Sequence, residues 1–215
     1  MISFYIIRHG ETLLNSLNRA QGWSDSPLTG NGEKTAKELG IKLKNITFSA
    51  AYTSDMLRAE QTAKLILSTK GNDDIKIQKD MRLREWCLGS MDAEHNTTFI
   101  QMVSDWLGGV TSFAELNRRL PDVAMAIYEH DTTGMAEPFT DIANRLNSVL
   151  VDIAHNKSLK ENSNILVVTH AFAIKTFLYL FAPEKLCTMD KLKNATILKL
   201  LYDGKSFFFE KTDFE

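Results

Sequence analysis

The sequence has almost no net charge. Its 25 lysines and arginines nearly balance 27 aspartates and glutamates, which leaves a formal net charge of -2. A chain with this balance has no general electrostatic attraction to nucleic acids or to membranes, so we expect neither as a partner. Any recognition of an anion must come from a few cationic side chains that lie close together.

Cysteines and long apolar runs are also scarce. The two cysteines, Cys87 and Cys187, lie far apart and form no CxxC pair, which favours ordinary reduced thiols over a disulfide framework. The apolar stretch at the amino terminus, Ile2 to Ile7, is too short for a signal peptide or a membrane span, and no basic segment precedes it. These features predict a cytoplasmic protein.

Several sequence motifs that mark common enzyme classes are missing. There is no GxSxG, GxxxxGKS/T, HExxH or GxGxxG segment, which argues against a serine hydrolase, a P-loop protein, a zinc protease and a dinucleotide-binding protein. No cluster of carboxylates suggests a metal site. We therefore expect no metal and no cofactor.

Apolar runs that are present predict the elements of an α/β fold. Ile2–Ile7 and Asn164–His170 have the nearly continuous apolar pattern of parallel strands buried on both faces, and Phe48–Ser54 is a weaker candidate. Helical spacing of apolar residues follows each strand, with Thr29 or Asn31 as an N-cap in the first case. The alternation predicts a three-layer α/β/α arrangement around a mostly parallel, doubly wound central sheet.

The second half of the chain adds two features to this core. From about residue 93 to residue 160 the sequence has helical segments, broken by glycines and prolines, and no convincing strand. We predict a helical insertion over one edge of the sheet, within a single domain of residues 1–215. The tail predicts a C-terminal hairpin with Asp203-Gly204 at its turn. Such a hairpin could pair with a second copy across a two-fold axis, so a homodimer is one of the oligomeric states that the sequence allows.

Two of the predicted strands end in a histidine, and this placement points to a site. His9 and His170 follow strands that are distant in sequence, and ligands of open parallel sheets bind beyond the carboxyl ends of the strands. Arg8 precedes the first histidine. Arg58 falls in the first turn of the helix that follows the Phe48–Ser54 strand, and the free N–H groups and dipole of this helix end also favour an anion. Two guanidiniums beside imidazoles suit a phosphate, because a guanidinium matches two phosphate oxygens.

The chain resembles the histidine phosphatase superfamily, also called the phosphoglycerate mutase-like family. The resemblance spans most of the chain except the helical insertion. It rests on motifs that appear in the family's order and at its spacing, namely RHGET at 8–12, Asn15, QGWSDSPLTGNG at 21–32, SDMLRAEQTA at 54–63, LREW at 83–86 and VVTH at 167–170.

The resemblance implies the roles of the site residues. His9 would be the nucleophile that becomes phosphorylated, and Arg8, Arg58 and His170 would hold the phosphoryl oxygens. Glu85 would be the general acid for the leaving alcohol and then the base for the incoming water. Asn15, Gln21, Gly22 and Thr29 would be weaker phosphate-pocket candidates. Ala171 departs from the glycine that the family often has after its second histidine, which affects how closely the backbone approaches the phosphate.

Other readings of these residues stay open. A histidine at the end of a buried strand, taken alone, is more often a satisfied polar residue than a catalyst, and Arg84 could form a surface ion pair with Glu85. Trp23 could line the pocket mouth or pack the loop. For the other histidines and for one arginine pair, we favour a solvent-exposed position over a role in the site. These residues are His95, His130, His155 and the Arg118-Arg119 pair. That pair could instead reach over the cleft to an anionic substrate.

The reaction that we predict is metal-independent hydrolysis of a small phosphorylated metabolite. A phosphoglycerate mutase-type isomerase is the alternative, and a non-catalytic phospholigand-binding module is a more distant one. We favour hydrolysis because Asp92 and Glu94, in the segment after Glu85, would repel a carboxylate-bearing phosphoglycerate. The sequence does not identify the substrate.

Overall fold

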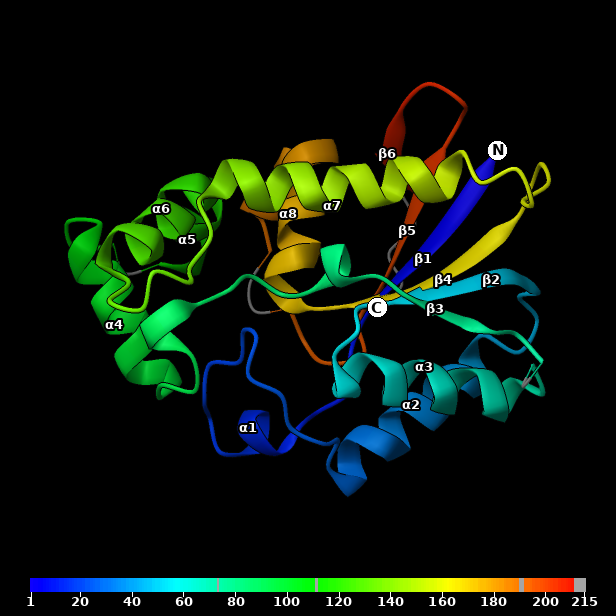
Figure 1. The fold of residues 1–215 in the computed structure, drawn as a ribbon, viewed down its shortest axis with the longest axis horizontal. Coiled ribbons are helices and arrows are strands. Elements are labelled where there is room, and N and C mark those ends of the chain that lie inside the picture. The colour runs from blue at the N-terminus through cyan, green and yellow to red at the C-terminus, as the bar shows by residue number, and fades with distance from the viewer. Residues whose placement is uncertain (73, 111, 190–191, 211–215) are drawn as a thin grey trace.

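A mixed six-stranded sheet forms the centre of the molecule (Figure 1). The computed structural model describes residues 1–72, 74–110, 112–189 and 192–210. The strand order is β3-β2-β4-β1-β5-β6, in which the first four strands are parallel, β5 pairs antiparallel with β1, and β6 pairs antiparallel with β5. The strands are β1 (Ile2–Arg8), β2 (Phe48–Thr53), β3 (Ile77–Lys79), β4 (Asn164–Thr169), β5 (Ile197–Tyr202) and β6 (Phe207–Phe209). The predicted α/β class with a mostly parallel sheet is confirmed.

The two central strands are apolar along their length because helices cover both of their faces. Alternate side chains of β1 belong to different cores, with Phe4 and Ile6 in one and Tyr5 and Ile7 in the other. Burial of such side chains away from water is the main stabilising contribution to a layered fold of this kind. The continuous apolar pattern of the sequence therefore follows from the position of β1 inside the sheet.

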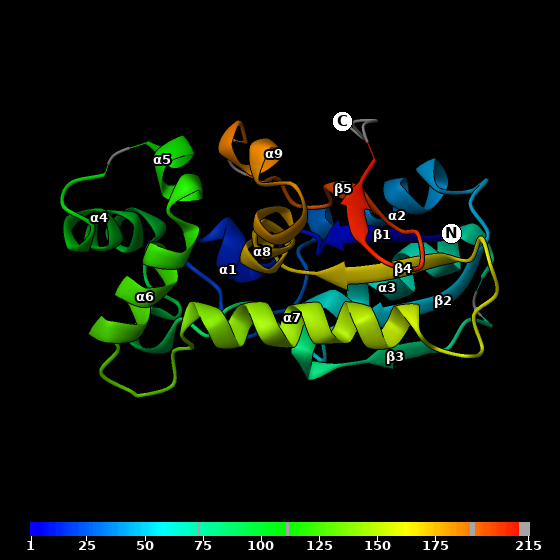
Figure 2. The same cartoon turned by 90° about the horizontal axis from the view of Figure 1, so that it is seen from above.

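Helices form a layer on each face of the sheet (Figures 1 and 2). One layer consists of α2 (Gly30–Lys42) and α3 (Leu57–Lys70), and the other contains α7 (Phe139–Ala154) and α8 (Ala171–Phe181). Thr29 is the N-cap of α2, because its hydroxyl accepts a hydrogen bond from the Gly32 N–H at 3.0 Å. The three-layer prediction is thus confirmed, and Thr29 rather than Asn31 is the cap.

The predicted helical insertion needs correction in extent and place. The helices α4 (Asn96–Trp106), α5 (Phe113–Arg118) and α6 (Leu120–His130) lie beyond the carboxyl ends of β1 and β4, rather than over an edge of the sheet (Figures 1 and 2). The helix α7 lies along the sheet, since Ile142, Leu146 and Leu150 join the same core as β1 and β4. It is the crossover that leads into β4. The insertion therefore ends near residue 130, not 160.

Short elements complete the chain. They are α1 (Leu13–Ser16), α9 (Pro183–Cys187) and two single-turn 3₁₀ helices at Met81–Leu83 and Gly89–Met91. The tail hairpin forms as predicted, with Asp203 and Gly204 in the turn between β5 and β6. The short edge strand β3 was not anticipated, because three residues are too few to show a period. No helix within the described residues is long and apolar enough to cross a membrane.

Two glycines allow the loop after β1 to pack against the start of α2. A Cβ atom added at Gly32 would lie 2.1 Å from the Glu11 carbonyl oxygen, and one added at Gly10 would lie 2.7 Å from the Gly32 oxygen. Both distances are well below van der Waals contact, so a larger residue at either position must displace backbone. This contact fixes the segment that follows His9.

We predict that Gly32→Ala lowers the free energy of unfolding by about 1–3 kcal/mol, as overpacking of a close backbone contact does. Gly30→Ala is the matched control, because a Cβ at Gly30 would meet nothing within 4 Å. The control should be neutral or stabilising by up to about 1 kcal/mol. Urea unfolding of both variants measures the difference, and equal stability would show that the close approach is not a constraint.

Candidate active site

The pairing of β1 with β4 brings the two strand-end histidines together. Arg8 pairs with Thr169 in the parallel register, and the N–H of His9 donates to the Thr169 carbonyl at 3.0 Å. The next residue on each strand is a histidine, and the centroids of the two rings lie 5.2 Å apart at an interplanar angle of 59°. Two imidazoles from distant parts of the sequence therefore share one place at the carboxyl edge of the sheet.

The His9 ring is buried and held in one tautomer. Its side chain is 3% exposed, and its Nδ1 lies 2.7 Å from the Gly10 carbonyl oxygen. Because a carbonyl oxygen only accepts, Nδ1 carries the proton and Nε2 keeps its lone pair. Burial, followed by the charges of Arg58 and Arg8, lowers the pKa of His9 well below its usual value. The ring is therefore neutral at pH 7, with Nε2 available as a nucleophile.

The His170 ring is also neutral and has the opposite tautomer. Its Nδ1 accepts a hydrogen bond from the Nε–H of Arg58 at 3.1 Å, so its proton is on Nε2, which lies 2.7 Å from the Ser54 hydroxyl. Burial, and then the charge of Arg58, lowers the pKa of His170 well below its usual value. His170 can thus donate one hydrogen bond from Nε2.

Arg58 is fully buried and holds the loop that follows Gln21. Its guanidinium donates to the carbonyl oxygens of Gly22 and Ser24 and to Asp25 Oδ1, in addition to the bond to His170. Asp25 also accepts from the Leu57 N–H at the start of α3. The expectation that this helix end favours a bound phosphate is therefore wrong, because a carboxylate of the chain already occupies it.

Arg8 offers a hydrogen-bond donor at the same edge. Its Nη1 donates to the Leu192 carbonyl, and its Nε–H is buried without a hydrogen-bond partner in the described part of the chain. Burial lowers the pKa of Arg8 to about 10, an effect that the charge of Glu85 opposes. A buried donor without a partner is costly, and an anionic ligand would satisfy it.

Glu85 is a buried carboxyl at the amino end of α8. Its Oε1 accepts from the N–H groups of Trp86 at 3.1 Å and Ala173 at 2.9 Å, and its Oε2 accepts from the Phe172 N–H at 3.0 Å. Burial nevertheless raises the pKa of Glu85, because desolvation outweighs these bonds. Arg84 pairs with Asp55 instead, so the reading of Glu85 as a surface ion pair is wrong.

Arg145, on α7, fixes the backbone around Glu85. Its guanidinium donates to the carbonyl oxygens of Arg82, Arg84 and Glu85 and forms a two-point ion pair with Glu137. Sequence reasoning missed this pair, since neither residue belongs to a recognisable motif.

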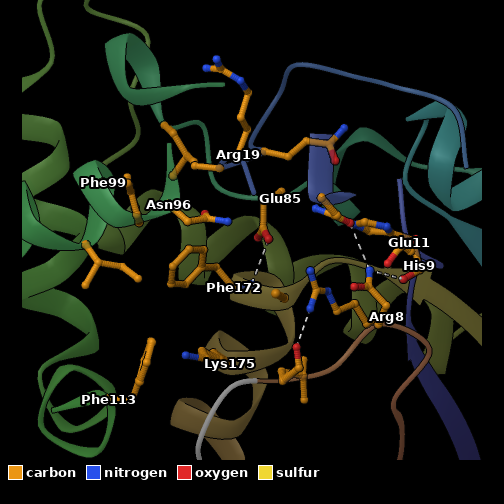
Figure 3. A pocket seen from close by; sticks show the side chains of 18 residues that line it. Arg8, His9, Glu11, Arg19, Glu85, Asn96, Phe99, Phe113, Phe172 and Lys175 are labelled. Atoms are coloured by element: carbon orange, nitrogen blue, oxygen red, sulfur yellow. Dashed lines mark hydrogen bonds between the residues drawn. The ribbon is translucent and has the colours of Figure 1, made fainter. Parts of the chain in front are cut away.

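A pocket of about 320 Å³ lies beside these groups (Figure 3). It is lined by Arg8, His9, Glu11, Asn15, Arg19, Ala20, Gln21, Glu85, Leu88, Asn96, Phe99, Ile100, Phe113, Ala171, Phe172, Lys175, Leu192 and Asn194. Arg58 and His170 are not among the lining residues, although the His170 ring lies 5.2 Å from the His9 ring. The helices α4 and α5 and the segment at 192–194 contribute residues that the sequence did not single out.

The weaker candidates divide between pocket and scaffold. Asn15, Gln21 and Ala171 line the pocket. Gly22 and Thr29 do not, which contradicts their placement as phosphate-pocket residues. The Gly22 N–H donates to Asp92. The Thr29 hydroxyl donates to the Glu11 carboxylate and accepts from the Gly32 N–H as the cap of α2.

The two carboxylates of the acidic segment after Glu85 do not line the pocket. Asp92 accepts hydrogen bonds from the N–H groups of Gly22, Trp23 and Ser24, and Glu94 accepts from the His95 N–H. The argument that these two carboxylates repel a phosphoglycerate is therefore wrong, because neither lines the pocket.

The remaining residues with open readings belong to the scaffold or the surface. Trp23 packs the loop, where its indole N–H donates to the Glu85 carbonyl and the Arg84 guanidinium lies over its ring. Arg118 is exposed, and Arg119 donates to Asp122 and to the Leu107 carbonyl. The three other histidines are exposed at helix ends, namely His95, His130 and His155.

Comparison with known proteins identifies the family. The model of the histidine phosphatase superfamily (branch 1) matches residues 4–214, and the chain belongs to this superfamily. A curated relative from Enterobacter sp. (strain 638), described as a probable phosphoglycerate mutase, is 30% identical over 208 residues, which cover 94% of this chain and 86% of the relative.

Solved structures agree with this assignment. A crystal structure of a phosphoglycerate mutase from Bacillus anthracis superposes with a TM-score of 0.89 at 32% identity, covering 98% of this chain and 92% of that one. A phosphoserine phosphatase from Entamoeba histolytica has the same fold, with a TM-score of 0.73 at 22% identity and coverage of 100% and 98%. Proteins that share this fold thus include one described as a phosphoglycerate mutase and one described as a phosphoserine phosphatase.

We predict that Arg145→Ala lowers the free energy of unfolding by about 2–4 kcal/mol, because it leaves three carbonyl groups and a partly buried carboxylate without their donor. Arg82→Ala is the control, since Arg82 forms more exposed ion pairs with Asp80 and Asp152 and such pairs contribute less than about 1 kcal/mol. Urea unfolding measures both. A loss in Arg145→Ala no larger than in the control would contradict the role of Arg145 as the support of Glu85.

Proposed function

We propose that the protein is a metal-independent phosphomonoester hydrolase that acts through a phosphohistidine at His9 on a small phosphorylated metabolite. The observation that carries this proposal is the hydrogen bond from His9 Nδ1 to the Gly10 carbonyl. It leaves the Nε2 lone pair free on a ring that lines the same pocket as Arg8 and Glu85.

In the first step Nε2 of His9 attacks phosphorus, and a P–N bond forms as the bond to the ester oxygen breaks. Glu85 gives its proton to the departing oxygen, so the leaving group departs as an alcohol. The unpartnered Nε–H of Arg8 supports a role in holding a phosphoryl oxygen. The Gly10 carbonyl accepts from Nδ1 and so stabilises the positive charge that develops on the ring.

In the second step water attacks the phosphorus of the phosphohistidine. Glu85, now a carboxylate, takes a proton from the water, the P–N bond breaks, and the electron pair returns to Nε2 of His9. Inorganic phosphate leaves, and both residues regain their starting states. The raised pKa of Glu85 suits it to hold a proton in one step and to take one in the next.

His170 and Arg58, together with residues of the pocket wall, complete the proposed site. His170 can contact a phosphoryl oxygen if its Nε2–H exchanges Ser54 for that oxygen. Arg58 fixes the His170 tautomer and adds positive charge, although its other hydrogen bonds hold the loop. Asn15, Gln21 and Ala171 would contact the phosphate from the pocket wall. Two buried guanidiniums supply the positive charge that the reaction needs.

A phosphoglycerate mutase reaction is the second candidate, because the 30% identical relative and the 32% identical structure carry that description. A mutase must hold a phosphorylated sugar acid as acceptor in place of water. The rings of Phe99, Phe113 and Phe172 line the pocket beyond His9, and such an apolar surface suits an apolar ester better than a small, highly polar sugar acid, which favours water as the acceptor. A coupled assay of 3-phosphoglycerate isomerisation beside a phosphate-release screen separates the two reactions.

We predict that His9→Ala reduces phosphate release from a chromogenic phosphate ester by at least about a thousandfold, while vanadate still binds through the arginines. His155→Ala, at an exposed histidine, is the control and should keep full activity. Release by the unmodified protein should survive a strong chelator. Unchanged turnover in His9→Ala would overturn the nucleophile assignment, and no turnover in the unmodified protein would favour the binding module.

Glu85→Gln should lower kcat/KM for alkyl phosphates about 100- to 10,000-fold and for 4-nitrophenyl phosphate far less, since only the alcohol needs a proton. Glu33→Gln, at an exposed glutamate, is the control and should keep full kcat/KM for both kinds of ester. In the unmodified protein, kcat/KM for alkyl phosphates should fall as pH rises through the raised pKa of Glu85, because the acid form is lost. Equal losses across leaving groups would remove Glu85 from the acid role.

A further inference from the structure

Lys175 is a charged residue inside an apolar helix. It belongs to α8, whose other residues from Ala171 to Phe181 are apolar apart from Thr176 and Tyr179. Its side chain is only 8% exposed, yet it lines the pocket. A methionine or leucine at this position would fill the same space without the cost of removing an ammonium from water. The proposed phosphoryl-transfer steps do not use this residue.

A neutral side chain holds the ammonium of Lys175 in place. Nζ donates to Asn117 Oδ1 at 2.8 Å, and that amide is oriented by its own bonds to the Leu186 and Met189 carbonyls. The partner is therefore a neutral amide rather than a carboxylate. Nζ also lies 5.5 Å from the centre of the Phe172 ring. Burial lowers the pKa of Lys175 to about 8, so it is still mainly protonated at pH 7.

The position of Lys175 separates it from His9, the proposed nucleophile. Figure 3 shows Lys175 beside Phe113 and Phe172, on the opposite side of the pocket from His9. The residues around it are apolar, and two of them, Ile100 and Phe113, leave more than a third of their surface exposed. A smaller apolar cavity of about 50 Å³ adjoins the same residues. Exposed apolar side chains that line a pocket favour an apolar ligand.

We propose that Lys175, oriented by Asn117, binds a carboxylate of the substrate, and that Phe99, Phe113 and Phe172 contact the apolar body that joins this carboxylate to the phosphate ester. The substrate class is then an apolar or aromatic phosphomonoester that carries a carboxylate at the end remote from phosphorus. This inference rests on the proposed function of the site and names the kind of ester that it accepts.

Two matched phosphonates test the subsite without turnover, namely 4-(carboxymethyl)phenylphosphonate and its neutral analogue 4-(carbamoylmethyl)phenylphosphonate. They differ only in the remote group, which is a carboxylate in the first and a neutral amide of similar shape in the second. Calorimetry should show that the unmodified protein binds the acid about tenfold more tightly than the amide. Lys175→Met should remove this preference and keep the affinity for the amide. Lys37→Met, at an exposed lysine of α2, is the control for net charge and should keep the preference.

The corresponding phosphate esters then test turnover. The acid ester should have the higher kcat/KM through a lower KM, since a remote ion pair contributes to ground-state and transition-state binding alike. Equal affinities of the two phosphonates for the unmodified protein, or an acid preference that survives in both Lys175→Met and Lys175→Gln, would overturn the subsite. A normal acid preference in binding with no hydrolysis of either ester would leave the subsite standing and overturn only the hydrolase proposal.

Discussion

The parallel pairing of β1 with β4 is the constraint on which the rest of the site depends. Its register sets Arg8 opposite Thr169, and the following residue of each strand is therefore a histidine at the same edge of the sheet. A shift by one residue would turn every apolar side chain of β1 to the wrong face, so burial in two cores fixes the register strongly. The stability of the sheet and the position of His9 thus have one cause.

Around this edge the protein buries cationic groups beside rings that stay neutral. Arg8 and Arg58 keep their charge when buried, because the pKa of a guanidinium starts far above neutral pH. The same burial and the same positive charges keep His9 and His170 unprotonated. The result is a positive site that contains an uncharged imidazole, which is the combination that the proposed attack on an anionic phosphate ester requires. Glu85 adds a carboxyl whose pKa is raised by burial, so the positive charge, the proposed nucleophile and the proposed proton donor arise from one buried environment.

The sequence predicted the parts of this arrangement that leave a local pattern. The strands β1 and β4 are continuous apolar runs because both of their faces are covered, and the histidines stand where those runs stop. The direction in which a loop side chain points leaves no such pattern. For this reason Asp92 and Thr29 were predicted to face the substrate, although neither lines the pocket. The extent of the insertion was misjudged because α7, a layer helix, is amphipathic like the insertion helices. Lys175 did leave a signal, a single charge in an apolar helix, but its meaning depends on the pocket that distant segments form.

The central claim is that the Gly10 carbonyl holds the proton on Nδ1 of His9 and leaves Nε2 to take the phosphoryl group. Phosphorus NMR of the protein, trapped during turnover of a phosphate ester and kept at alkaline pH, measures this directly together with peptide mapping. The account predicts a phosphohistidine at residue 9 with phosphorus attached to Nε2. Attachment at Nδ1, or a phosphoryl group on His170 with His9 unmodified, would contradict it.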